Sequence, residues 1–261
     1  MPYRLRGLFA PRSGVTMSLR RTLSAALIVA VVLGFGGGCS LFEDTQQVLR
    51  DSTAEIANGN YTFTSTVPDH SSVVGIVHKP SRSMSLSFKN AGDSSATKIV
   101  GGYRYVTITG SPKALRTGRN WTRVDLSRLQ KAQQYAVDGP ELTGVATLLA
   151  HTNSAERDGS AIFGTLDGSK VTAMITTVGG TIKGVWSDAD VAPFRFAPYA
   201  ATLDDEGRLT GLVITMPQLG LIPPGAWTVS ITGYGEAEPV TAPEAADVVD
   251  EDDSYYELVN K

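Results

Sequence analysis

Cysteine and histidine are scarce in this chain of 261 residues, which contains one cysteine and three histidines. A single cysteine excludes an intramolecular disulfide and any metal site built from several cysteines. The nucleophile motif G-x-S-x-G, the zinc motif H-E-x-x-H and the P-loop are all absent from the sequence. We therefore expect a protein that is not an enzyme, with no catalytic residue, no metal and no cofactor.

Two weaker catalytic patterns have simpler explanations. Ser95 and Lys98 have the spacing of a serine–lysine pair, but such a short pattern often arises by chance, and its partner motifs are absent. Asp69-His70 has the residue types of half an acid–base or metal site, yet no second pair lies near it in sequence. Surface positions are the simpler explanation for all three histidines, His70, His78 and His151.

Negative charge dominates the chain once its first 38 residues are set aside. Those residues hold five arginines and no acid, so the rest has 18 basic residues against 26 acidic ones, a net charge of −8. Nucleic-acid binding relies on Lys and Arg contacts to phosphates, and anionic lipid headgroups attract basic faces. The composition therefore argues against nucleic acid as a partner.

The N-terminal residues have the order of a bacterial lipoprotein signal. Arg20-Arg21 precede an apolar run at 23–35, whose 13 residues suit a signal core and fall short of the ~20 that span a membrane. Small glycines at 36–38 then lead to Cys39, the only cysteine. The alternative is that the apolar run is an uncleaved anchor or a buried helix, with an ordinary thiol after it.

This arrangement resembles a lipobox, although Gly36 stands where an aliphatic residue is typical. The resemblance implies removal of a signal peptide at residues 1–38, which starts at Met1 or at Met17, and diacylglycerol on the Cys39 thiol. We expect the mature chain to be lipid-anchored at the outer, extracytoplasmic face of the cell membrane.

Alternation of apolar and polar residues with a period of two begins at Asn60. At 61–67 apolar residues alternate with threonines, and at 83–88 they alternate with serines. Clusters rich in Gly, Pro, Asn, Asp and Ser separate such runs, which indicates an antiparallel meander with one buried face. The expected strands lie at 61–67, 74–76, 84–88, 103–107, 120–125, 160–167, 194–203, 208–216 and 226–233, while 171–178 fits either a strand or a helix.

Two stretches have helical spacing instead. Ser40 and Glu43 have the spacing of a capping box, and apolar residues at 42, 49 and 56 predict one amphipathic helix that ends near residue 58. Apolar residues at 142, 145, 148 and 149 predict a second helix that ends near His151. The acidic stretch at 247–253 is typical of a solvated tail.

Three segments carry a resemblance to a known family. In order they are GRNWTRVD at 118–125, DGSAIFGTLD at 158–167 and AATLDDEGRL at 200–209, after the cysteine signal, the capped helix and the meander. The chain resembles the actinobacterial lipoproteins of the LppX/LprG type over roughly residues 42–245 and, more distantly, the LolA/LolB lipoprotein carriers. It departs from the family pattern at Phe163, where Tyr is common, in the strand at 194–203, which lacks the usual Trp, and at 168–192.

The resemblance implies an antiparallel half-barrel with helices packed into its concave face. The predicted fold is therefore α+β, a strongly curved antiparallel sheet of about ten strands with two or three helices on its concave face. Gly75, Gly164 and Gly211 are the expected bulge or kink sites. The expected organisation is a signal peptide at 1–38, the acylated cysteine and N-terminal helix at 39–59, the half-barrel at 60–245 and the acidic tail at 246–261.

The resemblance also implies a hydrophobic cavity for a lipid or glycolipid between sheet and helices. The expected function is thus a cell-envelope lipoprotein that binds or carries an apolar lipid, with the membrane and the lipid as its partners. Residue types alone favour aromatic side chains that merely fill a core, as in a structural or signalling envelope module. A hydrolase whose triad is scattered in sequence is a third alternative. The candidate lining residues occupy alternate strand positions and are Phe88, Tyr105, Phe163, Phe196 and Trp227.

Overall fold

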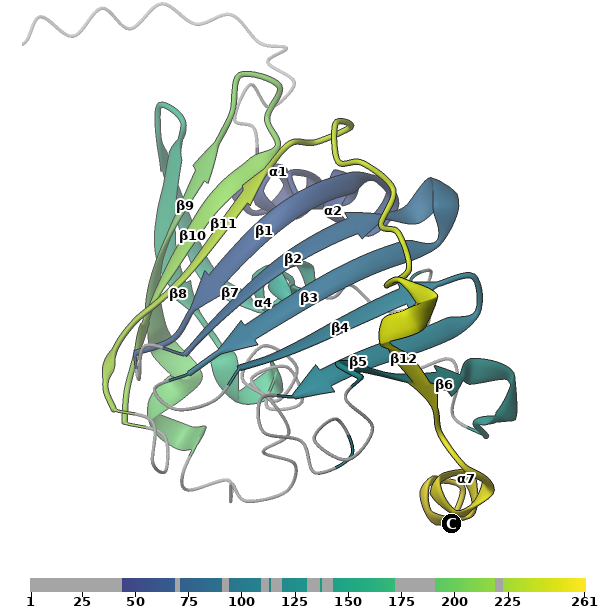
Figure 1. The fold of residues 1–261 in the computed structure, drawn as a ribbon. Helices are drawn as coiled ribbons and strands as arrows, with labels where there is room; N and C mark the ends of the chain where they lie inside the picture. The colour runs from purple at the N-terminus through teal and green to yellow at the C-terminus, as the bar shows by residue number, and fades with distance from the viewer. Residues whose placement is uncertain are drawn as a thin grey trace, which may run out of the picture. The chain divides into compact units, whose positions relative to one another are not determined.

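The period-two alternation of the sequence produces one large sheet in the computed structural model (Figure 1). The chain divides into two units, Met1–Leu41 and Phe42–Lys261, and all described residues belong to the second. The structure describes residues 44–68, 71–90, 94–108, 113, 119–130, 137, 143–171, 191–218 and 223–261.

The strands of the sheet are β1 (Asn60–Thr66), β2 (Ser72–His78), β3 (Ser83–Lys89), β4 (Ser94–Val100), β5 (Tyr103–Ile108), β6 (Trp121–Asp125), β7 (Thr152–Asp158), β8 (Ala161–Leu166), β9 (Ala197–Leu203), β10 (Leu209–Met216), β11 (Gly225–Thr232) and β12 (Val248–Asp250). The α-helices are α1 (Thr45–Asp51), α2 (Ala54–Asn58), α4 (Val145–Leu149) and α7 (Asp253–Val259). Short 3₁₀ turns are η1 (Lys79–Ser81), η2 (Leu126–Arg128), η4 (Gly168–Val171), η5 (Ala192–Phe196) and η6 (Ala245–Asp247).

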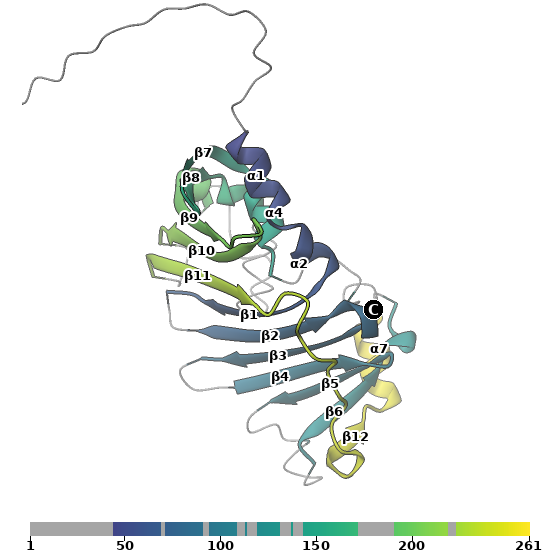
Figure 2. The ribbon, with the colours of Figure 1, turned by 90° about the horizontal axis from the view of Figure 1, so that it is seen from above.

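The strand order across the sheet is β12-β6-β5-β4-β3-β2-β1-β11-β10-β9-β8-β7. Every neighbouring pair is antiparallel except β12 and β6, which run parallel. The sheet is not closed, and it curves around α1, α2 and α4, which lie on its concave face (Figure 2). The predicted curved antiparallel sheet with a few helices on its concave face is therefore confirmed, with twelve strands among the described residues where about ten were expected.

Three of these strands were missed because their sequences alternate weakly. β4 buries only Ile99, β7 is an edge strand that buries no residue, and β12 has three residues. An edge or half-exposed strand needs no row of apolar side chains, so it has no period-two pattern.

The N-terminal helix predicted as one element consists of two short helices. Asp44 caps α1 by accepting a hydrogen bond from the Gln46 N–H, so the cap lies beyond the expected Ser40. The break follows because the Ser52 hydroxyl donates to the Leu49 carbonyl and the Thr53 hydroxyl to the Arg50 carbonyl. Such local bonds compete with helix continuation.

The predicted leucine-rich helix is present as α4, which buries Val145, Leu148 and Leu149. Together with Leu49 of α1 and Ile56 of α2, these side chains form one core with the concave-facing side chains of the sheet. These helices are too short to be stable alone, so their apolar contacts with the sheet hold them in place.

Two of the three expected kink glycines serve close packing instead. A Cβ at Gly75 would overlap the Phe63 ring, and one at Gly164 would overlap the backbone of Ser154. Gly211 does lie at a register shift between β9 and β10, as predicted.

The C-terminal residues are not a solvated tail, and that prediction is wrong for residues 248–259. Val248–Asp250 form β12 on the edge of β6, and Asp253–Val259 form α7, in which Tyr256 is 6% exposed. The acidic side chains pair with basic residues of the sheet region, which explains how a charged segment can pack. We call residues 248–259 the C-terminal strap.

Candidate functional site

The concave face is filled where helices cover it. Trp227 of β11 is 1% exposed, and its indole N–H donates to the Ser65 hydroxyl at 2.8 Å. The ring of Phe63, also fully buried, lies against Gly75. Burial raises the pKa of Tyr199 to about 12, and its hydroxyl donates to the Ser154 carbonyl at 3.1 Å. Trp227 is thus a packed core residue and not the wall of an open cavity.

Strand register separates the other candidate lining residues. Phe88 pairs with Ser95, and Ser95 pairs with Ile108, so these three side chains share the concave face. Tyr105 is three residues before Ile108 in β5 and therefore points to the convex face. Phe163 pairs with Ala200 on the convex face and is 41% exposed.

Tyr105 and Phe163 therefore cannot line a cavity on the concave face, and those two predictions are wrong. Phe196 is also misplaced, because it ends η5 and is 71% exposed. Phe88 is half-buried on the concave face and packs against the core. Of the five candidates, only Phe88 and Trp227 lie on the expected face.

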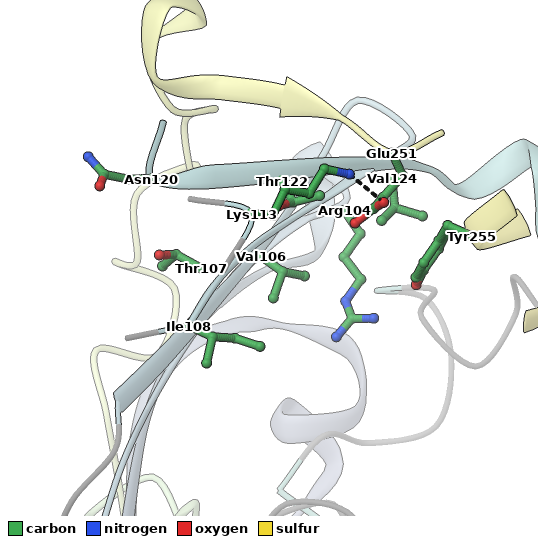
Figure 3. Close-up of a pocket in the computed structure, with 10 residues that line it drawn as sticks. All are labelled: Arg104, Val106, Thr107, Ile108, Lys113, Asn120, Thr122, Val124, Glu251 and Tyr255. Carbon is green, nitrogen blue, oxygen red and sulfur yellow. Dashed lines mark hydrogen bonds and ion pairs between the residues drawn. The ribbon is translucent and has the colours of Figure 1, made fainter. Parts of the chain in front are cut away.

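A cavity of about 290 Å³ lies at the other end of the concave face, beside β5 and β6. Figure 3 shows Arg104, Val106 and Ile108 on one side of β5, with Thr107 on the other side. Val124 of β6 pairs with Arg104 and adds to the apolar wall. The lining residues are Arg104, Val106, Thr107, Ile108, Lys113, Asn120, Thr122, Val124, Glu251 and Tyr255.

An ion pair borders this cavity on the side of the C-terminal strap. Lys113 Nζ lies 2.6 Å from Glu251 Oε2, and the two side chains are 24% and 16% exposed (Figure 3). The Glu251 N–H donates to the Arg123 carbonyl at 2.9 Å, so the strap backbone fixes where this carboxylate lies. The cavity thus combines apolar walls with two cationic side chains and one carboxylate.

Further contacts hold the strap to the sheet. Arg123 forms a two-pronged pair with Asp250, at 2.5 and 3.0 Å, and Arg128 lies 2.6 Å from Asp253. The Arg123 guanidinium holds the pKa of the Asp250 carboxyl below its usual range. The Tyr256 hydroxyl accepts a hydrogen bond from the Asp125 N–H at 2.7 Å.

The convex side of the same strands has a second hollow, of about 400 Å³. Tyr105, which is 7% exposed, lines it together with Ala242, Pro243 and Ala245. Arg119 and Arg123 also line it, but the Arg123 guanidinium is already paired with Asp250. This hollow has a largely charged and polar lining.

The weaker catalytic patterns are not supported by the geometry. Ser95 faces the concave side, whereas Lys98 pairs with Tyr105 on the convex side and donates to the Thr241 carbonyl at 3.0 Å. His78 bonds with Ser81 in a turn and His151 is exposed, while His70 lies outside the described residues. Within the described residues, no three His, Cys, Asp or Glu side chains gather into a metal site.

Arg104, Lys113, Glu251 and Tyr255 were not predicted as site residues. The sequence does contain a signal for Arg104, because this charged residue alternates with Val106 and Ile108 along one face of β5. Glu251 was part of the acidic run interpreted as a tail, and nothing local in the sequence connects it with Lys113. Cys39 lies outside the described residues, and in the described part of the chain no helix is long and apolar enough to span a membrane.

Comparison with known proteins adds only weak structural likeness. No family model matches the chain, and no curated protein matches it. A solved structure of an uncharacterized conserved protein from Thermus thermophilus is similar, with a TM-score of 0.35 and 11% sequence identity. The match covers 80% of this chain and 100% of that one.

Proposed function

We propose that this chain is a cell-envelope lipoprotein, anchored through acylated Cys39 at the outer face of the cell membrane, that binds or carries a lipid or glycolipid. The observation that carries the proposal is the cavity beside β5 and β6, on the face that the resemblance to lipid-binding lipoproteins implies. Its position differs from the expected one, because the space between the helices and β11 is occupied by core side chains.

The size of the cavity favours one acyl chain or part of one. About 290 Å³ is close to the lower end of the range of small-molecule pockets, about 300–1,000 Å³. Each buried CH₂ contributes about 0.8 kcal/mol, so a segment of about ten carbons gains roughly 8 kcal/mol before the costs of association. Ile108 is 52% exposed at the cavity, so apolar surface is available to such a chain.

The short distance between anchor and fold supports exchange with a membrane. Asp44, the N-cap of α1, follows Cys39 by only five positions in the sequence. A chain of this length reaches at most about 18 Å. The folded unit therefore stays within reach of lipid headgroups when the cysteine is acylated.

The test uses a chain that begins at Ser40, produced in an actinobacterial host and purified without detergent. Organic-solvent extraction and mass spectrometry should recover a stoichiometric lipid. Val106→Asp places a charge on the cavity wall and should abolish the lipid while the protein stays folded, because Val106 is only half-buried. Val213→Asp is the matched control, since Val213 is 43% exposed on the convex face and should leave the lipid bound.

A second candidate is a structural or signalling envelope module with a filled core. The packing around Trp227, Phe63 and Phe194, all at most 2% exposed, favours it. An empty protein that takes up no lipid on later challenge would support this candidate and contradict the first.

A further inference from the structure

The strap brings a carboxylate to the place where a lipid headgroup would lie. Glu251 Oε2 contacts Lys113 Nζ, and the walls below consist of Val106, Ile108 and Val124. An anionic amphiphile has the same two parts, an acidic group joined to hydrocarbon. In the protein, Glu251 of the strap supplies the acidic group, and the apolar side chains of β5 and β6 lie beside it.

The carboxylate of the strap and the apolar wall of the sheet differ in how far they are shielded from water. The Glu251 side chain is 16% exposed, so its carboxylate is largely shielded from water at its contact with Lys113. Ile108 is 52% exposed, so the apolar wall is only partly covered. Arg104 faces the same side of β5 as Val106 and Ile108, and it is a second cation near the cavity (Figure 3).

We propose that Glu251 is an internal substitute for the headgroup of an anionic single-chain amphiphile, and that such a ligand displaces it from Lys113 and loosens the C-terminal strap. This inference rests on the proposed function and specifies the ligand class and the regulation of that site. The carboxylate or phosphate of the ligand pairs with the ammonium group of Lys113, and the hydrocarbon chain of the ligand covers the apolar wall. The strap is thus an autoinhibitory contact that a neutral lipid would not release.

The contacts of the strap are suited to such an exchange. Partly exposed ion pairs contribute little each, so replacement of one carboxylate by another is nearly neutral, and burial of the ligand chain then drives binding. The Arg123–Asp250 and Arg128–Asp253 pairs lie outside the exchange and keep the strap tethered.

The test compares dodecanoate with dodecanol, two probes with the same chain and different headgroups. The protein begins at Ser40, before the unit Phe42–Lys261, and is first stripped of lipid. Calorimetry should show dodecanoate binding about tenfold more tightly than dodecanol, because the carboxylate replaces Glu251 at Lys113, whereas the dodecanol hydroxyl loses water beside the intact ion pair without gaining a partner. Amide hydrogen exchange of residues 248–256 should increase with dodecanoate and stay unchanged with dodecanol.

Variants separate the exchange from a general loosening of the strap. Glu251→Gln should tighten dodecanoate binding about threefold and leave dodecanol binding unchanged. Lys113→Met should remove the preference for dodecanoate. Arg128→Gln is the matched control, because it removes a strap ion pair away from the cavity and should keep the preference.

Three results would overturn the inference. Dodecanoate binding without increased exchange in the strap would show that Glu251 is not displaced. Equal binding of the two probes would contradict an anionic ligand and leave the proposed lipid binding standing. Binding of neither probe, with no lipid recovered by extraction, would end both proposals.

Discussion

Two parts of one sheet are held together by different forces. In the helix-covered half, β1 and β7–β11, apolar side chains of the sheet and of α1, α2 and α4 form a continuous core. In the strap-bound half, β5, β6 and β12, three ion pairs connect the sheet region with the C-terminal strap. Among the described residues, the other ion pairs join neighbours in one helix or one hairpin.

The two kinds of contact respond differently to salt and pH. Apolar contacts carry no charge, so they do not titrate and are not electrostatically screened, whereas partly exposed ion pairs are weak and screened by salt. The cavity lies in the strap-bound half.

The largest effect is expected in the helix-covered half. Trp227→Ala removes a fully buried side chain and leaves the Ser65 hydroxyl without its bond, so the free energy of unfolding should fall by about 3–5 kcal/mol. Trp121→Ala in β6 is the control, because Trp121 is half-exposed and contacts Lys98 through a cation–π interaction at 5.5 Å. Urea unfolding should show a loss of less than about 1 kcal/mol for this control, and equal losses would contradict the comparison.

The second effect concerns tight packing on the concave face. Gly75→Ala introduces a methyl group into the Phe63 ring and should lower the free energy of unfolding by about 1–3 kcal/mol. Gly211→Ala is the matched control, because its Cβ would meet only Thr202 at 3.7 Å, and its effect should stay within about 0.5 kcal/mol. A small loss for Gly75→Ala would mean that the Phe63 ring can move away.

Much of this frame could be predicted from sequence because it follows local rules. Alternation in β1, β9 and β11 matches the observed burial residue by residue, and in β10 it does so after the register shift at Gly211. Each of these strands has one apolar face, and the turn residues between strands are explicit in the sequence.

The site could not be predicted, because apolar–polar alternation does not determine which strands pair or which face of a strand is buried. Alternation places Ile162 and Phe163 on opposite faces, yet both are apolar, and only the pairing of β8 with β9 decides which one is buried. The pairing of β12 with β6 joins segments more than 120 residues apart, and its acidic residues resemble a solvated tail until their basic partners are known.

A third, smaller effect tests the strap itself. Tyr256→Phe leaves the Asp125 N–H without its acceptor and should lower the free energy of unfolding by about 1 kcal/mol. The amide of Asp125 should also exchange faster, while amides in β10 should not change. Leu258→Ala, at a position of α7 that is 70% exposed, is the control for damage to the helix and should have little effect. Faster exchange throughout the sheet would contradict the independence of the two halves.

The smallest effect is a pH dependence confined to the strap. The Arg123 guanidinium lowers the pKa of Asp250 in the folded protein, so this pair stabilises the strap above the unfolded pKa of about 3.9. Its contribution is lost as the pH falls below about 4 and through the folded pKa, since the carboxyl is then neutral. Asp250 is 65% exposed, and solvent screening keeps the effect below about 1 kcal/mol.

Hydrogen exchange of residues 248–256 from pH 5 to pH 3, corrected for the intrinsic pH dependence of exchange, measures this loss. Asp250→Asn should raise the exchange of the strap amides at pH 5 above that of the unmodified protein, and should reduce their further increase as the pH falls. Amides of β11 serve as the internal reference, because apolar burial there does not titrate in this range. Parallel acid loosening of β11 would mean that the ion pairs support the whole sheet, and the helix-covered half would then not be an independent frame for a movable cover.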